Sequence, residues 1–404
     1  MNKNFALKLF EGFSINRWND LVRPFELVEM DKDAEKMVLA YIIGKYEEAE
    51  GKKIHWDWMI WASLFDLLRK IALSDIKNPV QNIIKYKYPE EYKKLSQWVL
   101  KQYENIIDSP RVYKKFEDYI KVISGQKKVS EDLELTVHVF KAAHKYSTLR
   151  ELEMIAPVNE SERLEKIFRE VNSDIQKFLD LRGVQLLITR QKPFEFLMKI
   201  EQLRFQTRWN QTPRVPATSV LGHCFFVAIL TLLFLDQSGT NVCPKRLYND
   251  YFSALFHDLP ESVTRDIISP VKQATDGFPL VVKDIEDLIV KEELVPFMED
   301  YYKDEILYFT SDEFSNRIVL EGKTCLVTFE DLNSKYNYDS FNPVDGKLVR
   351  IADHYSALLE ADASILHGIT SQHLREGKAN LLRTYEKGKI LNGIDAYSMF
   401  NDFA

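Results

Sequence analysis

The stretch SALFHDLPE at residues 253–261 says most about how this chain folds. Apolar and small residues lead into His257 and Asp258, and a second carboxylate, Glu261, follows three residues later. An adjacent His and Asp offer a nitrogen and an oxygen donor side by side, and a divalent metal can use both. The apolar spacing puts the pair at the C-terminal end of a buried helix, Tyr248–Phe256, with Pro260 in the first turn of the next helix. The stretch therefore predicts a metal site built between helices.

Two residues elsewhere in the chain extend this pattern. His223 lies upstream, near the start of a very apolar segment for which Thr218 and Ser219 are suitable helix caps. Asp353 lies downstream, in the stretch RIADHYSALLE at residues 350–360. The order His … His-Asp … Asp, on successive predicted helices, resembles the HD-domain metal-dependent phosphohydrolases. The resemblance implies that the metal ligands are His223, His257, Asp258 and Asp353.

This set of ligands limits the choice of metal. Two imidazoles and two carboxylates suit one divalent first-row ion such as Mn, Fe, Co, Ni or Zn. Magnesium fits less well, because it prefers oxygen ligands. A metal of this kind polarises a phosphoryl oxygen and lowers the pKa of a bound water, which is the chemistry of phosphate-ester hydrolysis.

The residues around these ligands resemble a narrower group, the bacterial 5'-deoxynucleotidases of the HD superfamily. Arg208-Trp209 precedes His223 by fifteen residues, and residues 265–272 read RDIISPVK. The resemblance implies that Arg208 grips the phosphate, as guanidinium groups do, and that Lys272 adds positive charge. It also implies that Trp209 packs against the sugar and favours deoxyribose by excluding a 2'-hydroxyl.

Two acidic residues are the predicted acid/base catalysts. Glu261 lies one helical turn beyond Asp258, so it can face the same pocket. Asp266 is the other, either to activate water or to protonate the leaving 5'-oxygen. The sequence does not divide these roles between them. Asp266 also has an alternative reading as a helix cap, which its match to Asp75 in the first half of the chain favours.

Composition sets the wider class of protein. The chain has 404 residues, enough for two or three domains, with 45% hydrophobic residues and only 14 Gly and 14 Pro. Apolar residues recur at helical spacing in most windows, so we predict an all-α fold. A net charge of −7 disfavours binding to nucleic-acid polymers. The three cysteines have no CxxC spacing, the N-terminus has no signal-peptide core, and the longest apolar run (Cys224–Leu235) is short for a membrane span. These features predict a cytoplasmic protein without membrane contact.

The two halves of the chain repeat one another. Identical residues recur 191 positions apart without a gap, namely Arg17-Trp18-Asn19 with Arg208-Trp209-Asn210, Leu64-Phe65 with Leu255-Phe256, and Pro79-Val80 with Pro270-Val271 (208 − 17 = 191). Further on, His144 aligns with Asp353 at an offset of 209 (353 − 144 = 209). We interpret the repeat as a tandem duplication of one helical bundle, with residues 1–170 as the first copy and residues 185–404 as the second.

The first copy has lost the expected ligands. The positions of the four ligands are occupied there by Lys32, Asp66, Leu67 and His144, and the position of Glu261 is occupied by Lys70. We therefore predict a degenerate HD-like domain without a metal, in which the Lys32 ammonium takes up the vacant charge site. Arg17-Trp18 has two readings, either packing with a helix-end ion pair or a retained anion site with a regulatory role.

The segments outside the repeat carry two smaller predictions. Residues 159–162 read as a helix start and Arg182-Gly183 as its end, with no flexible linker, so the two copies should pack rigidly together. Residues 317–328 have strand-like composition around a Glu-Gly-Lys turn, which predicts a small β-hairpin. This hairpin is either a lid near the active site or surface decoration.

Together these features predict a metal-dependent phosphohydrolase that removes phosphate from a nucleoside 5'-monophosphate, preferably a deoxyribonucleotide. The alternative is a non-catalytic metal- and nucleotide-binding regulatory protein, and phosphodiester substrates are a third reading. The expected partner is a small-molecule nucleotide. The chain is then either a pseudo-dimeric monomer, in which the first copy replaces a partner subunit, or a homodimer.

Overall fold

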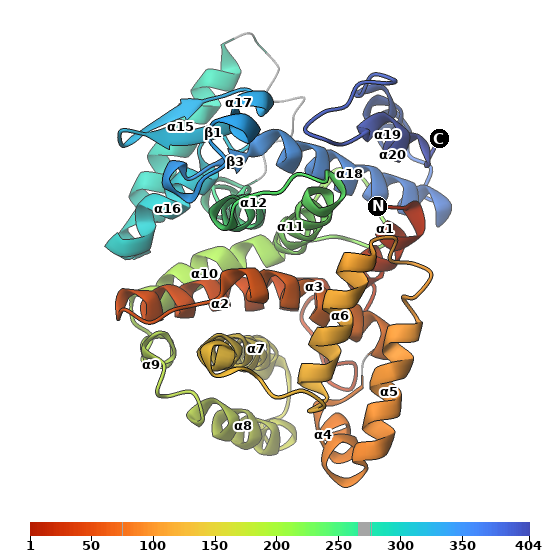
Figure 1. Cartoon of the computed structure of the whole chain (residues 1–404). Helices are drawn as coiled ribbons and strands as arrows, with labels where there is room; N and C mark the ends of the chain where they lie inside the picture. Colours follow the sequence, from red (N-terminus) through yellow and green to blue (C-terminus); the bar gives the residue numbers. More distant parts are fainter. Residues whose placement is uncertain (75, 266–274, 276) are drawn as a thin grey trace.

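The computed structural model describes residues 1–74, 76–265, 275 and 277–404, and these residues are mostly helical (Figure 1). Among them, the strands form one small antiparallel sheet in the order β2-β1-β3. The predicted all-α class is confirmed, and the sheet is a local addition to it.

The first half contains α1 (Lys3–Phe10), α2 (Glu29–Ala49), α3 (Trp56–Leu73), α4 (Asn78–Lys87), α5 (Pro89–Lys101), α6 (Pro110–Ile123), α7 (Glu134–Ile155), α8 (Ser161–Gln176) and α9 (Arg182–Ile188). The second half contains α10 (Lys192–Phe205), α11 (Val220–Gln237), α12 (Pro244–Phe256), α13 (Glu261–Thr264), α15 (Phe278–Glu293), α16 (Asp300–Thr310), β1 (Asn316–Leu320), β2 (Lys323–Leu326), α17 (Phe329–Ser334), β3 (Val344–Asp345), α18 (Gly346–Leu366), α19 (Gln372–Arg383) and α20 (Ala396–Asn401).

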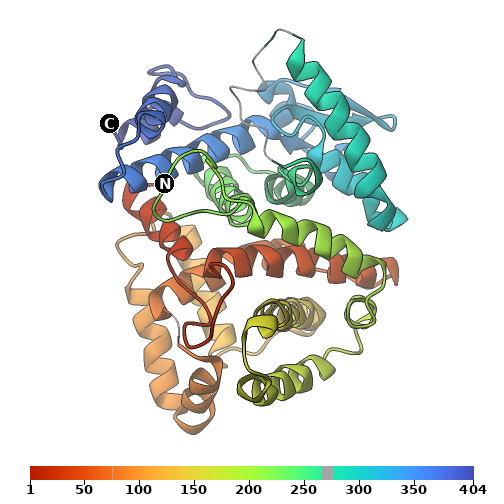
Figure 2. The same ribbon diagram turned by 180° about the vertical axis from the view of Figure 1, so that it is seen from behind.

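The two halves lie one above the other, with α2 and α10 running between them in both views (Figures 1 and 2). One continuous hydrophobic core joins the halves. The Phe226 ring of α11 lies 5.7 Å from Phe10 and 5.8 Å from Phe13, and the Phe252 ring of α12 lies 5.0 Å from Tyr41 of α2. Burying these aromatic rings stabilises the contact between the halves. A domain boundary between residues 170 and 185 stays a prediction.

The loop before each long core helix has the same backbone geometry in both halves. Each loop is closed by an isolated β-bridge, Asn16–Val28 in the first half and Thr207–Ser219 in the second. The Trp in each loop has a left-handed φ, 56° at Trp18 and 55° at Trp209. A second left-handed residue ends a later helix, Ser74 (53°) in one half and Arg265 (62°) in the other. All these pairs are 191 positions apart (207 − 16 = 191), which is the spacing of the sequence repeat.

The connection between the halves differs from the prediction. The helix that starts at Ser161 ends at Gln176, and Arg182-Gly183 opens α9 instead of ending α8. Gly183 serves close packing, because a Cβ there would lie 2.8 Å from the Cα of Ile43. The glycine was read as a helix stop, whereas it lets α9 lie directly on α2.

The predicted hairpin is present as β1 and β2. The strands pair antiparallel and turn at Glu321 and Gly322, which both have positive φ. β1 also pairs with β3, immediately before α18, and the buried Arg317 of β1 donates to the Tyr308 carbonyl over 2.8 Å. The hairpin is thus anchored to the start of the helix that carries Asp353.

The apolar segment at residues 224–235 lies inside α11. Among the described residues, α11 is the one helix long and apolar enough by composition to cross a membrane, and 89% of it is buried inside the protein. This burial agrees with the predicted role of α11 as a core helix.

Candidate metal centre

The structure brings the four predicted ligands together from three helices. His223 lies in the first turn of α11, whose N-cap Ser219 accepts a hydrogen bond from the Gly222 amide, as predicted for this helix start. His257 directly follows α12, and Asp353 lies on α18. The His223 Nε2 atom is 3.1 Å from Asp353 Oδ1 and 4.0 Å from Asp258 Oδ2, and His257 Nε2 is 3.3 Å from the same Asp258 oxygen.

Both imidazoles are held so that Nε2 faces the carboxylates. His257 Nδ1 lies 2.7 Å from the Ala254 carbonyl, which can only accept a hydrogen bond, so Nδ1 carries the proton. His223 Nδ1 is held by Ser356 Oγ at 3.0 Å and faces Glu360 Oε1 at 3.5 Å. The buried His223 Nε2 has no hydrogen-bond partner within the described part of the chain. A hydrogen-bonded Nδ1 and an available Nε2 are the arrangement that metal-binding imidazoles adopt.

The charges around the two carboxylates suit a cation. Burial by itself would raise the pKa of both Asp258 and Asp353, but the facing imidazoles and Arg208 outweigh it and lower both values. Two ionised carboxylates beside two imidazole Nε2 atoms, all largely buried, fit a divalent metal of borderline character. The donor chemistry therefore agrees with the predicted ion.

Cys224 is a neighbour of the site to which the sequence prediction gave no role. Its sulfur lies within 4.8 Å of ligand atoms of His257 and Asp258. A second group, His223, His257 and Asp353, also has its ligand atoms within 4.8 Å of one another, and the two groups share His257. Burial raises the pKa of the Cys224 thiol. One indication in the sequence that Cys224 would lie near the site was that it directly follows His223.

Arg208 lies against the predicted ligands, as expected for a substrate-binding cation. Its guanidinium is 3.6 Å from Asp258 Oδ2, 3.9 Å from Asp353 Oδ1 and 3.3 Å from Glu360 Oε1. Burial alone would lower the pKa of Arg208, but Glu360, Asp353, Asp258 and Glu261 raise it above its usual range. The guanidinium is therefore a fixed positive charge beside the metal ligands.

Trp209 is held by packing and by one hydrogen bond. Its indole nitrogen donates to Glu360 Oε2 over 2.7 Å. Its ring lies against α19, where a Cβ on Gly377 would come within 2.8 Å of the Trp209 Cη2 atom. The orientation of Trp209 is thus set by the protein, and its predicted contact with a sugar stays a prediction.

The remaining predicted residues divide into two groups. Glu261 is the first residue of α13, and its charge acts on Arg208, so it faces this site. Asp266 and Lys272 lie outside the described residues, as does Asp75 in the first half. His354, which follows Asp353, instead pairs with the Tyr385 hydroxyl at 2.9 Å.

Glu360 is a functional residue that the sequence analysis missed. This fully buried carboxylate accepts from Trp209, lies 3.5 Å from Arg214, and also faces Arg208 and His223. Glu151 plays the same part in the first half, where it accepts from Trp18 Nε1 over 3.0 Å and from Arg17. The two glutamates are 209 positions apart (360 − 151 = 209), which is also the offset between His144 and Asp353. Aligning the two halves at this offset would have identified Glu360 as a residue that both halves share.

Replacing Glu360 by Gln is expected to weaken metal binding by about 10- to 100-fold, because Nδ1 of His223 then loses its carboxylate neighbour. Competition with a chromophoric chelator measures this affinity. Glu376→Gln on the exposed side of α19, where Glu376 bonds Gln372, is the matched control and should leave it unchanged. If Glu360→Gln lowered thermal stability but not metal affinity, Glu360 would have only a packing role.

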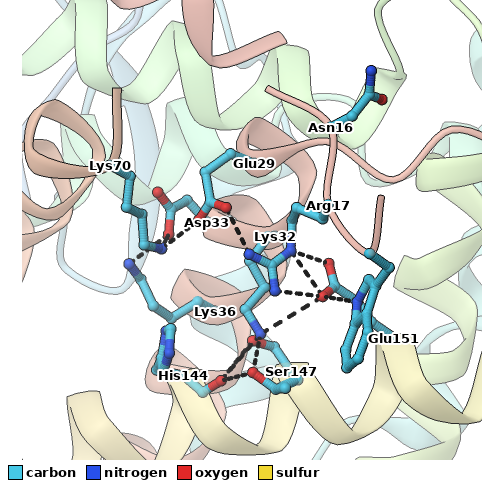
Figure 3. A network of polar contacts seen from close by, with 12 residues as sticks. Asn16, Arg17, Glu29, Lys32, Asp33, Lys36, Lys70, His144, Ser147 and Glu151 are labelled. Atoms are coloured by element: carbon cyan, nitrogen blue, oxygen red, sulfur yellow. Dashed lines mark hydrogen bonds and ion pairs between the residues drawn. The ribbon is translucent and has the colours of Figure 1, made fainter. Parts of the chain in front are cut away.

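In the first half, lysines lie among buried carboxylates near the residues that align with the predicted ligands (Figure 3). Lys36 Nζ lies 2.6 Å from both Asp33 Oδ1 and Asp66 Oδ2. Lys70 Nζ lies 2.6 Å from Asp33 and Glu29 and 3.2 Å from Asp66. These two ammonium groups pair with three carboxylates in a buried site, and Arg17 supplies a third positive charge to Glu29. In the first half, lysine side chains thus supply positive charge to the buried carboxylates.

The prediction for Lys32 is corrected by this geometry. Its ammonium donates to the His144 carbonyl and to Thr148 Oγ1 on α7, and it lies 4.0 Å from the Glu151 carboxylate. Lys36 and Lys70, not Lys32, pair with Asp33 and Asp66. Arg17 is bound by Glu29 at 2.7 Å and by Glu151, in agreement with the packing interpretation of the Arg-Trp pair.

Comparison with known protein families identifies one part of the chain. Residues 200–382 match the family model of the HD domain, and this range contains all four predicted ligands. HD domains bind divalent metals and are commonly metal-dependent hydrolases, which supports a phosphohydrolase in general. Searches of curated proteins and of solved structures gave no match.

Proposed function

We propose that this chain is a metal-dependent phosphohydrolase that removes the 5'-phosphate from nucleoside monophosphates, with deoxyribonucleotides preferred. One observation carries the proposal. Two imidazole Nε2 atoms and two carboxylates from three helices converge inside an HD domain, with the fixed guanidinium of Arg208 beside them. This combination serves an anionic substrate whose ester bond is broken by water.

The proposed mechanism assigns each side chain a separate task. His223, His257, Asp258 and Asp353 would hold a divalent metal, which would supply Lewis acidity toward a phosphoryl oxygen and lower the pKa of a bound water. Arg208 binds the phosphate oxygens, because a guanidinium matches them with two parallel donors. Glu261 and Asp266 share the proton transfers: one takes the proton from the attacking water, and the other returns a proton to the 5'-oxygen as the phosphorus–oxygen bond breaks. The products are the nucleoside and inorganic phosphate.

Selectivity for deoxyribose rests on Trp209. Its indole is fixed by Glu360 on one side and by α19 on the other, so it presents a rigid wall. A rigid wall next to C2' excludes a hydroxyl group more strongly than a movable side chain does. The Arg-Trp pair before the first ligand, which resembles the bacterial 5'-deoxynucleotidases, supports this assignment.

We also propose that the chain arose by tandem duplication and that its first copy has no metal site. The equal spacing of the two β-bridges and of the left-handed residues supports the duplication, as does the Trp–Glu hydrogen bond that occurs in each half. The lysine–carboxylate cluster formed by Lys36 and Lys70 supports the loss of the metal from the first copy.

The experiment is phosphate release from a panel of ribo- and deoxyribonucleoside 5'-monophosphates, with Mn, Co, Ni, Zn or Mg added to metal-stripped protein. We expect turnover that depends on the metal and favours the deoxy substrates by about 10- to 100-fold in kcat/KM. Equal turnover of both sugars would remove the role of Trp209 and leave the reaction standing. No turnover, together with stabilisation by metal and nucleotide, would favour the non-catalytic regulatory protein.

A further inference from the structure

The face between the two halves is built from matching positions of each. Helices α2 and α11 occupy equivalent places in the repeat, because they begin 191 positions apart (220 − 29 = 191), and they pack against each other. Two copies related by a twofold axis must make each contact twice. A contact between residue i of the first half and residue j of the second then recurs between residues i + 191 and j − 191.

The contacts at this face obey that relation. The Phe13 and Phe226 rings lie 5.8 Å apart, and the matching positions, 204 and 35, are Arg204 and Glu35, whose side chains lie 3.0 Å apart (13 + 191 = 204; 226 − 191 = 35). Phe10 also contacts Phe226, and its matching residue Glu201 is near enough to Glu35 to raise the pKa of that carboxyl (10 + 191 = 201). The Phe13–Phe226 contact therefore has its equivalent, Arg204–Glu35, on the other side of the axis.

The chemistry of the two sides differs. One side is an aromatic cluster of Phe10, Phe13 and Phe226. The other is a polar cluster in which the Arg204 and Glu35 side chains are fully buried, Arg204 lies 3.7 Å from Glu151, and burial raises the pKa of Glu35 to about 8. Each side is complementary to the partner that it has in this chain.

A third pair of matching residues meets at the axis itself. Gly222 and Asp31 are 191 positions apart (222 − 31 = 191), and a Cβ on Gly222 would lie 2.5 Å from Asp31 Oδ1. Asp31 also accepts a hydrogen bond from Ser219, the N-cap of the helix that carries His223. The space for the Asp31 carboxyl exists because the opposite residue has no side chain.

We propose that this face is a heterotypic interface, in which the second half fits the first half of the same chain and does not fit another second half. Pairing two second halves would set the Arg204 guanidinium against Phe226 without a carboxylate, and pairing two first halves would bring two Asp31 carboxyls together. The first half is therefore a permanent partner subunit within the chain, and it contacts the start of α11 through Asp31. This proposal concerns assembly and goes beyond the proposed reaction.

Substitutions in the full chain test the pairing. Arg204→Met leaves Glu35 buried without its cation, and we expect the melting temperature to fall by roughly 5–10 °C. Adding Glu35→Met should recover at least half of that loss, because both charges are then replaced by apolar groups, as on the aromatic side. Glu151 keeps Arg17 and Trp18 as partners in both variants. Lys199→Met, which removes a charge from the same helix at an exposed ion pair with Glu293, is the control and should have little effect.

Two results would overturn the proposal. The first is a double variant that is less stable than Arg204→Met alone, because the two sides of the face would then not be equivalent. The second is a wild-type dimer in light scattering that Arg204→Met dissociates, because the face would then bind a second chain. We expect the wild-type protein to be a monomer in light scattering. The melting temperature reports on folding and light scattering reports on mass. Both remain informative even if the chain hydrolyses no nucleotide.

Discussion

His257→Ala is expected to abolish metal-dependent phosphate release, with a loss in kcat/KM of roughly a thousandfold or more, because water activation depends on the bound metal. The imidazole Nε2 of His257 and the Asp258 carboxylate, 3.3 Å apart, form one side of the ligand set. Without the imidazole, the Asp258 and Asp353 carboxylates face each other with Arg208 as their main counter-charge. Metal analysis after dialysis should find the bound ion lost together with activity.

The matched control for this variant is His354→Ala. His354 is also partly buried and lies next to a ligand, but it pairs with Tyr385 and not with the carboxylates. We expect it to keep its metal and to keep activity within a few-fold of wild type, since it does not touch the reacting groups. If His354→Ala lost the metal and His257→Ala retained it, the assignment of ligands would be wrong.

Lys36→Met should produce the largest loss of stability, about 3–5 kcal/mol in the free energy of unfolding. The ammonium group is fully buried between Asp33 and Asp66, 2.6 Å from each, so its removal leaves two buried carboxylates to repel one another. Lys70 still contacts both carboxylates and balances part of their charge. We therefore expect the loss of stability not to exceed this range. The midpoint of denaturant unfolding measures the effect.

The surface pair Lys94–Glu91 supplies the control, because Lys94→Met removes an ammonium of the same kind from solvent. We expect almost no change in the free energy of unfolding there, because solvent screens this exposed pair. A chelator should leave the difference between Lys36→Met and wild type unchanged, because under our proposal the lysine cluster of the first half binds no metal. Equal effects of the two substitutions would contradict the view that Lys36 is part of a buried charge network.

The sequence was sufficient to predict which ligands would meet. His223 lies on α11, His257 and Asp258 directly follow α12, and Asp353 lies on α18; their order and flanking residues predicted the convergence before any distance was known. The all-α class and the small hairpin were also predicted, because both depend on local periodicity and turn residues.

The groups behind the ligands were not predicted, because they depend on tertiary packing. Glu360 is one carboxylate among many on a helix, and only its buried contacts with Trp209 and His223 set it apart. Lys36 lies one turn beyond Lys32, so choosing between the two ammonium groups required the direction of each side chain on α2. The role of Gly183 was misread for a similar reason, since its contact lies on a distant helix.

The contact between Gly377 and Trp209 has a consequence for how this protein can vary. Any side chain at position 377 would press on an indole that is already fixed by Glu360, and Glu360 in turn faces His223. Gly377 lies 24 positions beyond the last ligand (377 − 353 = 24), on a helix that supplies none of the four ligands. In a genetic screen for inactive alleles, substitutions at this glycine should therefore appear among those at the ligands, although position 377 touches no reacting group.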